Sequence, residues 1–564
     1  MQRIRIEQPM ADAIAVGRIW HYGEEVYTPS GRVVPADGRE TERQRFTAAV
    51  AAVRQELERL AATETIFAAH LELTEDPMLA ECVEAKIADG ATAADALHAA
   101  SEELSELFAQ IDDEYLRSRA DDVRDICRRI RRALQGAEPA VIAVPAGCVL
   151  AAEELAPSDT AAIDFSQACG LVTRRGSATS HVAILARNRG IPAIVGLGDV
   201  FETLAEGETV VLDGTAGELV VAPTPELESA YRRRAEERLR ADAACRIRAA
   251  EPAVTCDGRR ILVAANVGDA EETRHAIACG ADGIGLFRSE LLYMQQQRAF
   301  PDEAAQAAAY SAAAKACGDR PLVIRTLDIG GDKALPYYEF PHEENPFLGW
   351  RAIRVSLELR EVFRTQLRAI LRASAAGNVR VMFPMIVSLE ELHEARALLE
   401  SCKKELAAEG VAFDETLPVG VMIETPAAVM MAEELAAEVD FFSVGTNDLT
   451  QYMLAVDRGN NHIAAMYDPL HPAVVRALRR VVEAAHRHGR GAGICGEFAA
   501  APEHAELLAG LGFDELSVAA PAVAALKERI RCLDGEKARM FAGSICASAT
   551  KTEVHALIDR RKSE

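Results

Sequence analysis

Side chains suited to binding a phosphorylated anion follow strand-like segments in the C-terminal half of the chain. Glu424 and Asp448 carry hard oxygen donors, which hold Mg²⁺ through one or two carboxylates and leave its other positions to water and substrate. Arginine supplies a forked set of N–H donors that matches phosphate and carboxylate. Four arginines, an amide and a thiol complete the set: Arg288, Arg325, Arg351, Arg458, Asn447 and Cys495. These residue types predict a site for a small substrate that bears both a phosphate and a carboxylate.

A second reactive side chain, His181, lies far away in the sequence. It follows Thr179 and Ser180 and precedes VAILAR, so the pattern predicts a helix N-cap with His181 in the first turn. Free backbone N–H groups and the helix dipole favour an anion there, and they would stabilise a phosphoryl group on the imidazole. A lone His in a first turn is more often an ordinary surface residue, so the spacing by itself leaves both interpretations open.

The residues from Pro252 onward alternate strand-like and helix-like segments, which is the pattern of βα units. The expected strands are ILVAAN from Ile261, GIGLFR from Gly283, LVIRTLD from Leu322, VMFPMI from Val381, VGVMIE from Val419, FFSVGT from Phe441, AGICGE from Ala492 and ELSV from Glu515. The count of eight favours a (β/α)8 TIM-type barrel over an open doubly wound sheet. In such a barrel the C-terminal strand ends form one mouth, where the groups named above are expected to converge.

The N-terminal part is predicted to combine a helical bundle with a small α/β domain. Phe46, Val50, Val53, Leu57 and Leu60 form an apolar stripe at helical spacing. The stretch 102–134 is expected to place a second stripe inward, including Leu107, Ile126 and Ile130. After Pro139 short β-rich runs follow, and the opening strands, which have no local partner, are expected to join them.

These patterns predict an α/β multidomain protein in which the helical bundle is inserted into the small α/β domain. The expected boundaries are 1–22 and 139–223 for the small α/β domain, 23–138 for the inserted bundle, 224–251 for a charged helical linker, and 252–564 for the barrel. The charged linker has too few apolar residues for a core of its own, so it is expected to join independently moving bodies.

The composition excludes several classes of partner. The 564 residues include 62 Lys and Arg against 87 Asp and Glu, which gives a formal net charge of −25. Such a field repels polyphosphate, so no nucleic acid or anionic membrane partner is expected, and a basic protein partner is favoured. No apolar run is long enough to span a bilayer and the first residues lack a signal-peptide pattern, so a cytoplasmic protein is expected. The 12 cysteines contain no C-x-x-C pair, which argues against a zinc ribbon.

Long motifs along nearly the whole chain resemble enzyme I of the bacterial phosphotransferase system, the family of phosphoenolpyruvate-protein phosphotransferases. They are TSHVAILAR around His181, GLFRSE at Arg288, VIRTLDIGGDK from Val323, ENPFLGWRAIR from Glu344, VMIETPAA around Glu424, FFSVGTNDLTQYMLAVDRGN from Phe441, GICGE around Cys495, and DDEYLRSRADDVRDI from Asp112. The resemblance implies a mobile phosphohistidine domain with a helical insertion that binds the carrier protein HPr. It also implies a C-terminal barrel that binds phosphoenolpyruvate and forms a homodimer.

By the same resemblance, His181 is the residue that is phosphorylated before the group passes to a histidine of HPr. Glu424 and Asp448 would bind Mg²⁺, and Cys495 would protonate C3 of the departing enolpyruvate. The substrate would be held by Arg288, Arg325, Asn447, Asp448 and Arg458, with Arg351 as a further contact. The acidic Glu72, Glu75, Asp76 and Glu81 region of the bundle is expected to meet the carrier.

Particular features of the chain bear on the alternative functions. Pyruvate phosphate dikinase and phosphoenolpyruvate synthase need an ATP-grasp domain, whereas the first 140 residues or so read as helical without a glycine-rich phosphate loop. A non-catalytic regulator would be expected to lose the chemical residues, which are present. A paralogue serving a nitrogen-related or other dedicated carrier stays open. Ser177, where family members usually have a second glycine after Gly176, bears on loop flexibility and partner preference rather than on the reaction.

Overall fold

The computed structural model describes most of the chain. The described residues are 2–5, 14–22, 27–60, 70–71, 73–74, 77–109, 114–136, 142–155, 159–160, 163–175, 182, 186, 191–214, 217–296, 298–331, 333, 335, 337–458, 460, 462–463 and 466–563. His181 and three of the four acidic residues expected to meet the carrier, Glu72, Glu75 and Asp76, lie outside them. The chain divides into two compact units, Met1–Leu239 and Arg240–Glu564.

The first unit contains a seven-stranded sheet built from both ends of its sequence. Its order is β1 (Gln2–Arg5), β9 (Glu218–Val221), β8 (Thr209–Asp213), β2 (Ile14–Tyr22), β4 (Cys148–Ala152), β6 (Ala168–Thr173) and β7 (Ala193–Ile194). β2 lies antiparallel to β8 and parallel to β4, so the opening strands do complete the small α/β fold. Two short strands, β3 (Ile142–Ala143) and β5 (Ile163–Asp164), pair separately.

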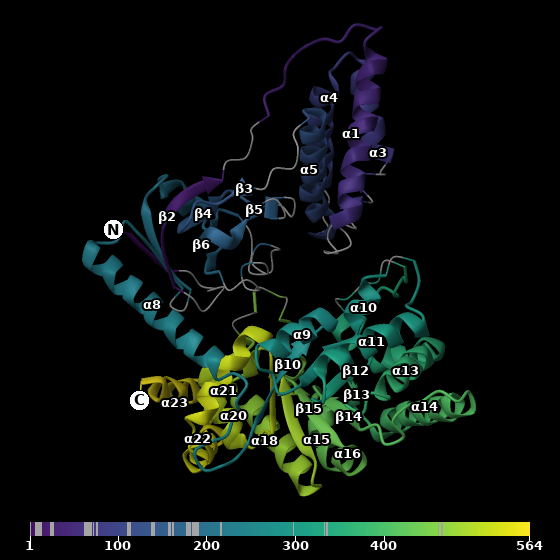
Figure 1. Cartoon of the computed structure of the whole chain (residues 1–564), viewed down its shortest axis with the longest axis vertical. Coiled ribbons are helices and arrows are strands. Elements are labelled where there is room, and N and C mark those ends of the chain that lie inside the picture. Colours follow the sequence, from purple (N-terminus) through teal and green to yellow (C-terminus); the bar gives the residue numbers. More distant parts are fainter. Residues whose placement is uncertain are drawn as a thin grey trace. The chain divides into compact units, whose positions relative to one another are not determined.

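A helical bundle connects β2 to β3 in the chain (Figure 1). It comprises α1 (Arg39–Leu60), α3 (Pro77–Ala88), α4 (Ala93–Ala109) and α5 (Glu114–Leu134). Phe46, Val53 and Leu57 of the predicted stripe are buried in its core. The prediction for Leu107 was wrong, because its side chain is 52% exposed. The helix ends two residues later, so its last turn extends beyond the packed layer that its earlier residues form.

The second unit is a closed barrel of eight parallel strands, which confirms the expected fold class. The strands are β10 (Leu262–Val267), β11 (Ile284–Arg288), β12 (Leu322–Arg325), β13 (Val379–Phe383), β14 (Val419–Ile423), β15 (Phe441–Gly445), β16 (Gly491–Cys495) and β17 (Glu515–Val518). All eight predicted strands are found. β10 pairs with β17 and so closes the barrel.

Helices surround the strands (Figure 1). They are α9 (Ala270–Ala278), α10 (Glu290–Met294), α11 (Glu303–Cys317), α12 (Ile353–Glu358), α13 (Arg360–Ser374), α14 (Leu389–Ala408), α15 (Pro426–Met430), α16 (Ala432–Glu438), α17 (Thr446–Leu454), α18 (Pro472–Arg487), α19 (Glu497–Ala500), α20 (Ala505–Leu511), α21 (Val523–Arg531), α22 (Gly535–Ala547) and α23 (Lys551–Ser563). Several begin at a residue whose side chain accepts backbone N–H bonds, such as Asp269, Ser388 and Asp534. The segment predicted as a charged linker forms α8 (Pro225–Ile247), and the boundary between the two units falls within it.

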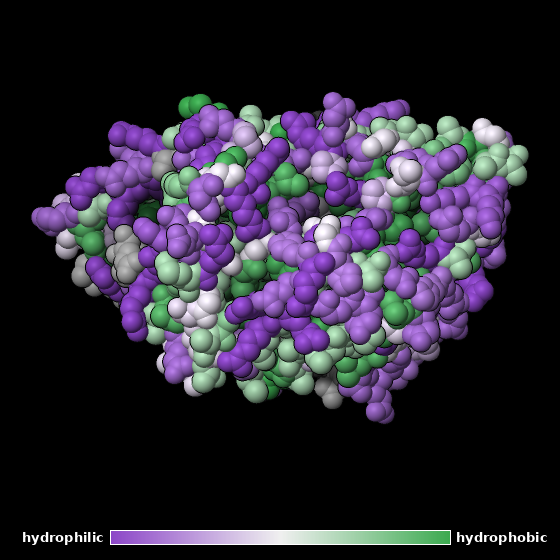
Figure 2. All heavy atoms as spheres, turned by 90° about the horizontal axis from the view of Figure 1, so that it is seen from below, coloured by the Kyte–Doolittle hydropathy of each residue, from purple (hydrophilic) through white to green (hydrophobic). Residues whose placement is uncertain are grey.

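Hydrophilic side chains predominate on the face shown in Figure 2, and apolar ones occur in patches between them. Within the described residues, no helix combines the length and apolar character needed to cross a membrane.

Candidate active site

The predicted barrel residues lie at the C-terminal ends of the strands. Arg288 and Arg325 are the last residues of β11 and β12 and are paired in register, so their side chains start from neighbouring positions. Glu424 directly follows β14, and Cys495 is the last residue of β16. Asn447 and Asp448 stand in the first turn of α17, which begins directly after β15. Parallel closure therefore brings these residues to one mouth.

Arg325 lies in a buried ion-pair cluster. Its Nη2 is 2.6 Å from Glu290 Oε1 and 3.1 Å from Asp328 Oδ2. Lys333 joins the same carboxylates, with Nζ 3.1 Å from Glu290 Oε1 and 2.9 Å from Asp328 Oδ2. Burial opposes the charged guanidinium, but Glu290 and Asp328 outweigh it and raise the pKa of Arg325. The cation is therefore fixed in position before any substrate arrives.

Arg351 links this cluster to the next strand end. Its Nη2 is 3.1 Å from Asp328 Oδ1, and its Nη1 is 3.5 Å from Asp448 Oδ1. Nη1 also donates to the Tyr452 hydroxyl at 3.1 Å. Burial works against ionisation of Asp328, yet Arg325, Lys333 and Arg351 together hold the pKa of that carboxyl well below its usual range. The Asp328 carboxylate thus pairs with all three cations, Arg325, Lys333 and Arg351, and holds them in place.

The side chain of Glu424 is buried and closely surrounded by backbone. It is 1% exposed, and its Oε1 accepts a 2.7 Å hydrogen bond from the backbone N–H of Met385. Met385 has a φ of 56°, a conformation that a non-glycine residue adopts at a cost. On the other side, a Cβ at Gly445 would lie 2.7 Å from Glu424 Oε2, so only glycine leaves the room that this carboxylate fills.

The carboxylates fit a divalent cation. Burial, followed by the charges of Asp448 and Asp328, raises the pKa of Glu424 to about 8. Such repulsion between buried carboxylates disappears when a cation stands between them. No group of three or more His, Cys, Asp or Glu side chains arranged to hold a metal occurs in the described part of the chain. Mg²⁺ needs only one or two carboxylates when water and a phosphate fill its other positions, so the pair Glu424 and Asp448 suffices.

Cys495 is a buried thiol beside these charges. Its Sγ lies 3.5 Å from the carbonyl oxygen of Val444, to which the thiol donates. Burial raises the pKa of Cys495 to about 11. The sulfur therefore keeps its proton near neutral pH, which suits a proton donor better than a nucleophile.

The other predicted residues differ in their surroundings. Arg288 and Arg458 are exposed, and Asn447 is half-buried. The structure thus pairs Arg351 directly with Asp448, links Arg325 to Arg351 through the shared Asp328, and leaves two arginines open to solvent. His181 falls outside the described residues, so its placement stays a prediction.

Sequence reasoning missed the roles of Lys333, Glu290 and Met385. Lys333 stands in the GGDK segment that follows β12, and this polar loop at a strand end was the available signal. Glu290 opens α10, two residues after the end of β11, where an acidic residue is typical of an ordinary helix first turn. The Met385 amide carries no side-chain signal at all.

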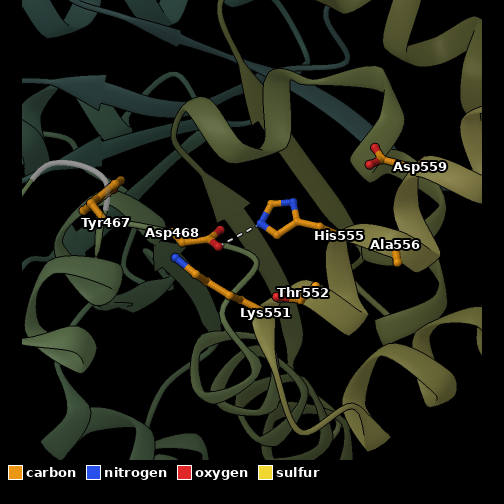
Figure 3. Close-up of a pocket in the computed structure, with 7 residues that line it drawn as sticks. All are labelled: Tyr467, Asp468, Lys551, Thr552, His555, Ala556 and Asp559. Carbon is orange, nitrogen blue, oxygen red and sulfur yellow. Dashed lines mark hydrogen bonds and ion pairs between the residues drawn. The ribbon is translucent and has the colours of Figure 1, made fainter. Parts of the chain in front are cut away.

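A pocket of about 610 Å³ lies at the start of α23 (Figure 3). It is lined by Tyr467, Asp468, Lys551, Thr552, His555, Ala556 and Asp559, none of which was predicted as a site residue. His555 points at Asp468, with Nε2 2.8 Å from Oδ2. Tyr467 connects the pocket to the active site, because its hydroxyl donates to the Asn447 carbonyl oxygen at 3.2 Å.

Replacing Tyr467 by Phe is expected to weaken substrate binding modestly. One hydrogen bond that holds the first turn of α17 is lost, at a cost of about 1 kcal/mol, or roughly fivefold in affinity. We expect KM for the anionic substrate to rise by about that factor, with kcat largely kept, in steady-state assays. His555→Gln, on the opposite wall, is the control and should leave KM unchanged. An unchanged KM for Tyr467→Phe would contradict this link.

Comparison with known proteins identifies the family of the chain. Three domain profiles of phosphoenolpyruvate-utilising enzymes match the chain: the N-terminal domain at residues 8–119, the mobile domain at 144–217 and the PEP-binding domain at 243–534. The phosphoenolpyruvate-protein phosphotransferases of Bacillus sp. (strain S) and Geobacillus stearothermophilus are each 41% identical over 536 residues, covering 92% of this chain and 92% of the relative. That of Haemophilus influenzae is 41% identical over 504 residues, covering 88% and 86%.

These relatives share the general phosphotransferase name, which does not favour the alternative of a dedicated nitrogen-related paralogue. The degree and extent of identity, together with the barrel and its cluster of arginines and carboxylates, place the chain in the phosphoenolpyruvate-protein phosphotransferase family, and the protein is a phosphotransferase.

Proposed function

We propose that the protein transfers the phosphoryl group of phosphoenolpyruvate to its own His181 and then to a histidine of the carrier protein HPr, the first step of sugar uptake by the phosphotransferase system. The observation that carries the proposal is the buried cluster of Arg325, Arg351 and Asp448 beside Glu424 and the protonated Cys495. A site with fixed cations suits a substrate with a phosphate and a carboxylate.

The proposed roles follow from burial and charge. Arg325 and Arg351 are already held by carboxylates, so they would present preorganised donors to charge that develops on the transferring phosphoryl group. Arg288 and Arg458, which are exposed, would close on the anion from the solvent side together with Asn447. Glu424 and Asp448 would hold Mg²⁺, which when bound neutralises phosphate charge.

Cys495 would supply the proton that converts enolpyruvate to pyruvate. Its Sγ–H bond breaks as a C3–H bond forms, and the sulfur is left as a thiolate. The raised pKa supports this role, because it keeps the thiol protonated at the pH of the reaction.

Replacing Cys495 by Ala is expected to slow turnover about a hundredfold while leaving substrate binding nearly unchanged. The thiol belongs to an apolar layer of the barrel with Leu286, Val323, Met382 and Met422, so alanine costs some packing but no charge. Steady-state turnover and calorimetric titration with phosphoenolpyruvate would measure the two effects separately. Unchanged turnover would contradict the role as acid.

Labelled phosphoenolpyruvate and Mg²⁺ provide the direct test of the whole proposal. We expect the wild-type protein to become labelled in an acid-labile, base-stable form, as phosphohistidine does, and His181→Ala to stay unlabelled. Addition of HPr should remove the label from the wild-type protein. Failure of the wild-type protein to take up label, or equal labelling of His181→Ala, would refute the proposed reaction.

The finer partners and organisation belong to the same proposal. The acidic surface of the chain, with its net charge of −25, supports a basic carrier docking on the helical bundle. We also propose the domain boundaries given above, with the His181 domain moving between barrel and carrier. A homodimer formed through the barrel and a cytoplasmic location complete the proposal. Transfer assays with HPr and with nitrogen-related carriers, run side by side, would decide between the two.

A further inference from the structure

A polar row crosses the barrel interior directly beneath Cys495. Ser443 of β15 is paired in register with Gly493 of β16, and Gly493 is paired with Glu515 of β17. The next row of inward-facing residues, nearer to the mouth, contains Gly445, Cys495 and Ser517 on the same three strands. Because residues two apart on a strand face the same side, Cys495 lies one layer above the row that contains Ser443 and Glu515.

Glycines make room for the Glu515 side chain inside the barrel. A Cβ at Gly285 would lie 2.4 Å from Glu515 Oε1, and a Cβ at Gly493 would lie 3.5 Å from the same oxygen. A larger residue at Gly285 would occupy the space that the carboxyl group uses. Glu515 is only partly buried, since it stands at the start of β17, at the end of the barrel opposite the active-site mouth.

Ser443 lies two strands from Glu515 in the same row of the barrel interior and next to the row that contains the thiol. Its side chain is buried one inward-facing row from Cys495, and its hydroxyl lowers the pKa of that thiol. The thiol also responds to the charge of Glu515. Neighbouring strands lie about 4.8 Å apart, so the Cα atoms of Ser443 and Glu515 are about 10 Å apart. Two side chains that both point to the barrel axis, with at most one water between them, span that distance.

The groups around Glu515 permit it to exchange protons near neutral pH. Burial raises its pKa to about 6; Arg380 of β13 opposes the shift, and Asp282 and Asp514 add to it. Neither carboxylate oxygen of Glu515 receives a hydrogen bond from the described part of the protein. Cys495, Arg380, Asp282 and Asp514 are the titratable or charged groups that act on it.

We propose that Glu515, acting through the Ser443 hydroxyl, returns a proton to Cys495 after each turnover. This rests on the proposed function, in which Cys495 has given its proton to C3 of enolpyruvate. The thiolate takes the Ser443 hydroxyl proton, Ser443 takes the proton of the Glu515 carboxyl group, and the Glu515 carboxylate takes one from water at the far end of the barrel. Ser443 and Glu515 are positioning residues, because neither touches the substrate.

The proton already on Cys495 before the first turnover makes the proposal testable. Rapid-quench assays with excess labelled phosphoenolpyruvate and HPr would follow pyruvate from the first turnover onward. For Glu515→Gln we expect one pyruvate per subunit at the wild-type rate, followed by turnovers about tenfold slower. A merely structural role would slow the first turnover as much as the later ones.

Three further variants complete the test. Ser443→Ala should show the same burst and slow phase, and Ser443→Thr, which restores a hydroxyl, should recover most of the wild-type rate. Ser517→Ala is the matched control, because the Ser517 hydroxyl donates to Asn266 Oδ1 at 2.7 Å and is not part of the path. It should behave as the wild-type protein.

The outcomes separate this inference from the function on which it rests. If Glu515→Gln matches the wild-type steady-state rate, or if its first turnover is equally slow, the relay is refuted while the phosphotransfer reaction stands. If the wild-type protein itself forms no pyruvate, the proposed function fails and the relay with it.

Discussion

Replacing Arg325 by Met is expected to abolish phosphoryl transfer and to destabilise the barrel by about 3–5 kcal/mol. The guanidinium is 6% exposed and stands between Glu290 and Asp328, which are themselves buried. Without it, Glu290 is left with Lys333, which it shares with Asp328, itself also paired with Arg351, so part of the buried negative charge is left without a full partner. Turnover is lost because the donors fixed for the transferring group are gone.

Urea unfolding followed by circular dichroism, together with the labelling assay, would measure the two effects of Arg325→Met. Arg479→Met is the matched control, because Arg479 makes an exposed ion pair with Glu483 one helical turn away. Its removal should cost less than about 1 kcal/mol and leave labelling intact. Adding Glu290→Gln to Arg325→Met should recover part of the lost stability, since one uncompensated charge is removed, but no activity. Equal destabilisation by Arg325→Met and Arg479→Met would contradict the claim that the buried ion pairs of Arg325 stabilise the barrel.

The barrel could be predicted from sequence because its strands are buried on both faces. Runs such as VGVMIE and FFSVGT are almost continuously apolar, and each ends in polar residues that have no place in a core. The position of Glu424 and Cys495 at the mouth follows from that topology alone. The order of apolar runs and of the polar residues that end them therefore predicted both the fold and the candidate residues at the strand ends in this half of the chain.

The separation of the four arginines into two kinds could not be predicted. The sequence contains no sign of a difference between them, yet Arg325 and Arg351 are buried and paired, whereas Arg288 and Arg458 are exposed. The difference depends on Asp328, Glu290 and Asp448, which meet them only after the barrel closes. Lys333 was missed for the same reason, since Glu290 is 43 residues away from it in the chain.

Short-range pattern also failed at Leu107. Its helical spacing fits the apolar stripe, but burial depends on where the helix ends relative to its neighbours. The Met385 amide is a further case, because a backbone N–H in a left-handed conformation has no signature in a side-chain pattern. The spacing of apolar residues in the sequence therefore cannot predict contacts that depend on helix ends, caps or backbone conformation.

Replacing Glu424 by Gln is expected to have opposite effects on activity and stability. Turnover should fall about a thousandfold, which corresponds to about 4 kcal/mol of lost charge stabilisation at the metal site. The metal-free protein should nevertheless become more stable by roughly 1–2 kcal/mol above neutral pH, because a repelled buried carboxylate is replaced by a neutral amide of the same shape. The backbone N–H of Met385 keeps an acceptor in the glutamine carbonyl oxygen.

The direction of the predicted stability change follows from the pH dependence of the free energy of unfolding. The pKa of Glu424 is about 8 in the folded protein, against an ordinary value of 4.5, chiefly because of burial and then because of Asp448 and Asp328. The folded state therefore holds a proton that the unfolded chain releases. The stability contributed by that proton is complete below pH 4.5 and is lost as pH rises through 8.

Thermal unfolding of metal-free protein between pH 5 and pH 8.5 would reveal the difference. The wild-type Tm should fall across this range relative to that of Glu424→Gln, which has no carboxyl group to titrate. Mg²⁺ should raise the wild-type Tm at pH 8 and have little effect on the variant, because binding to the folded state alone adds stability. Glu434→Gln, an exposed change in α16, should follow the wild-type curve. Parallel curves for wild type and Glu424→Gln would mean that the buried carboxylates do not repel one another, and the argument for a cation between Glu424 and Asp448 would lose its electrostatic basis.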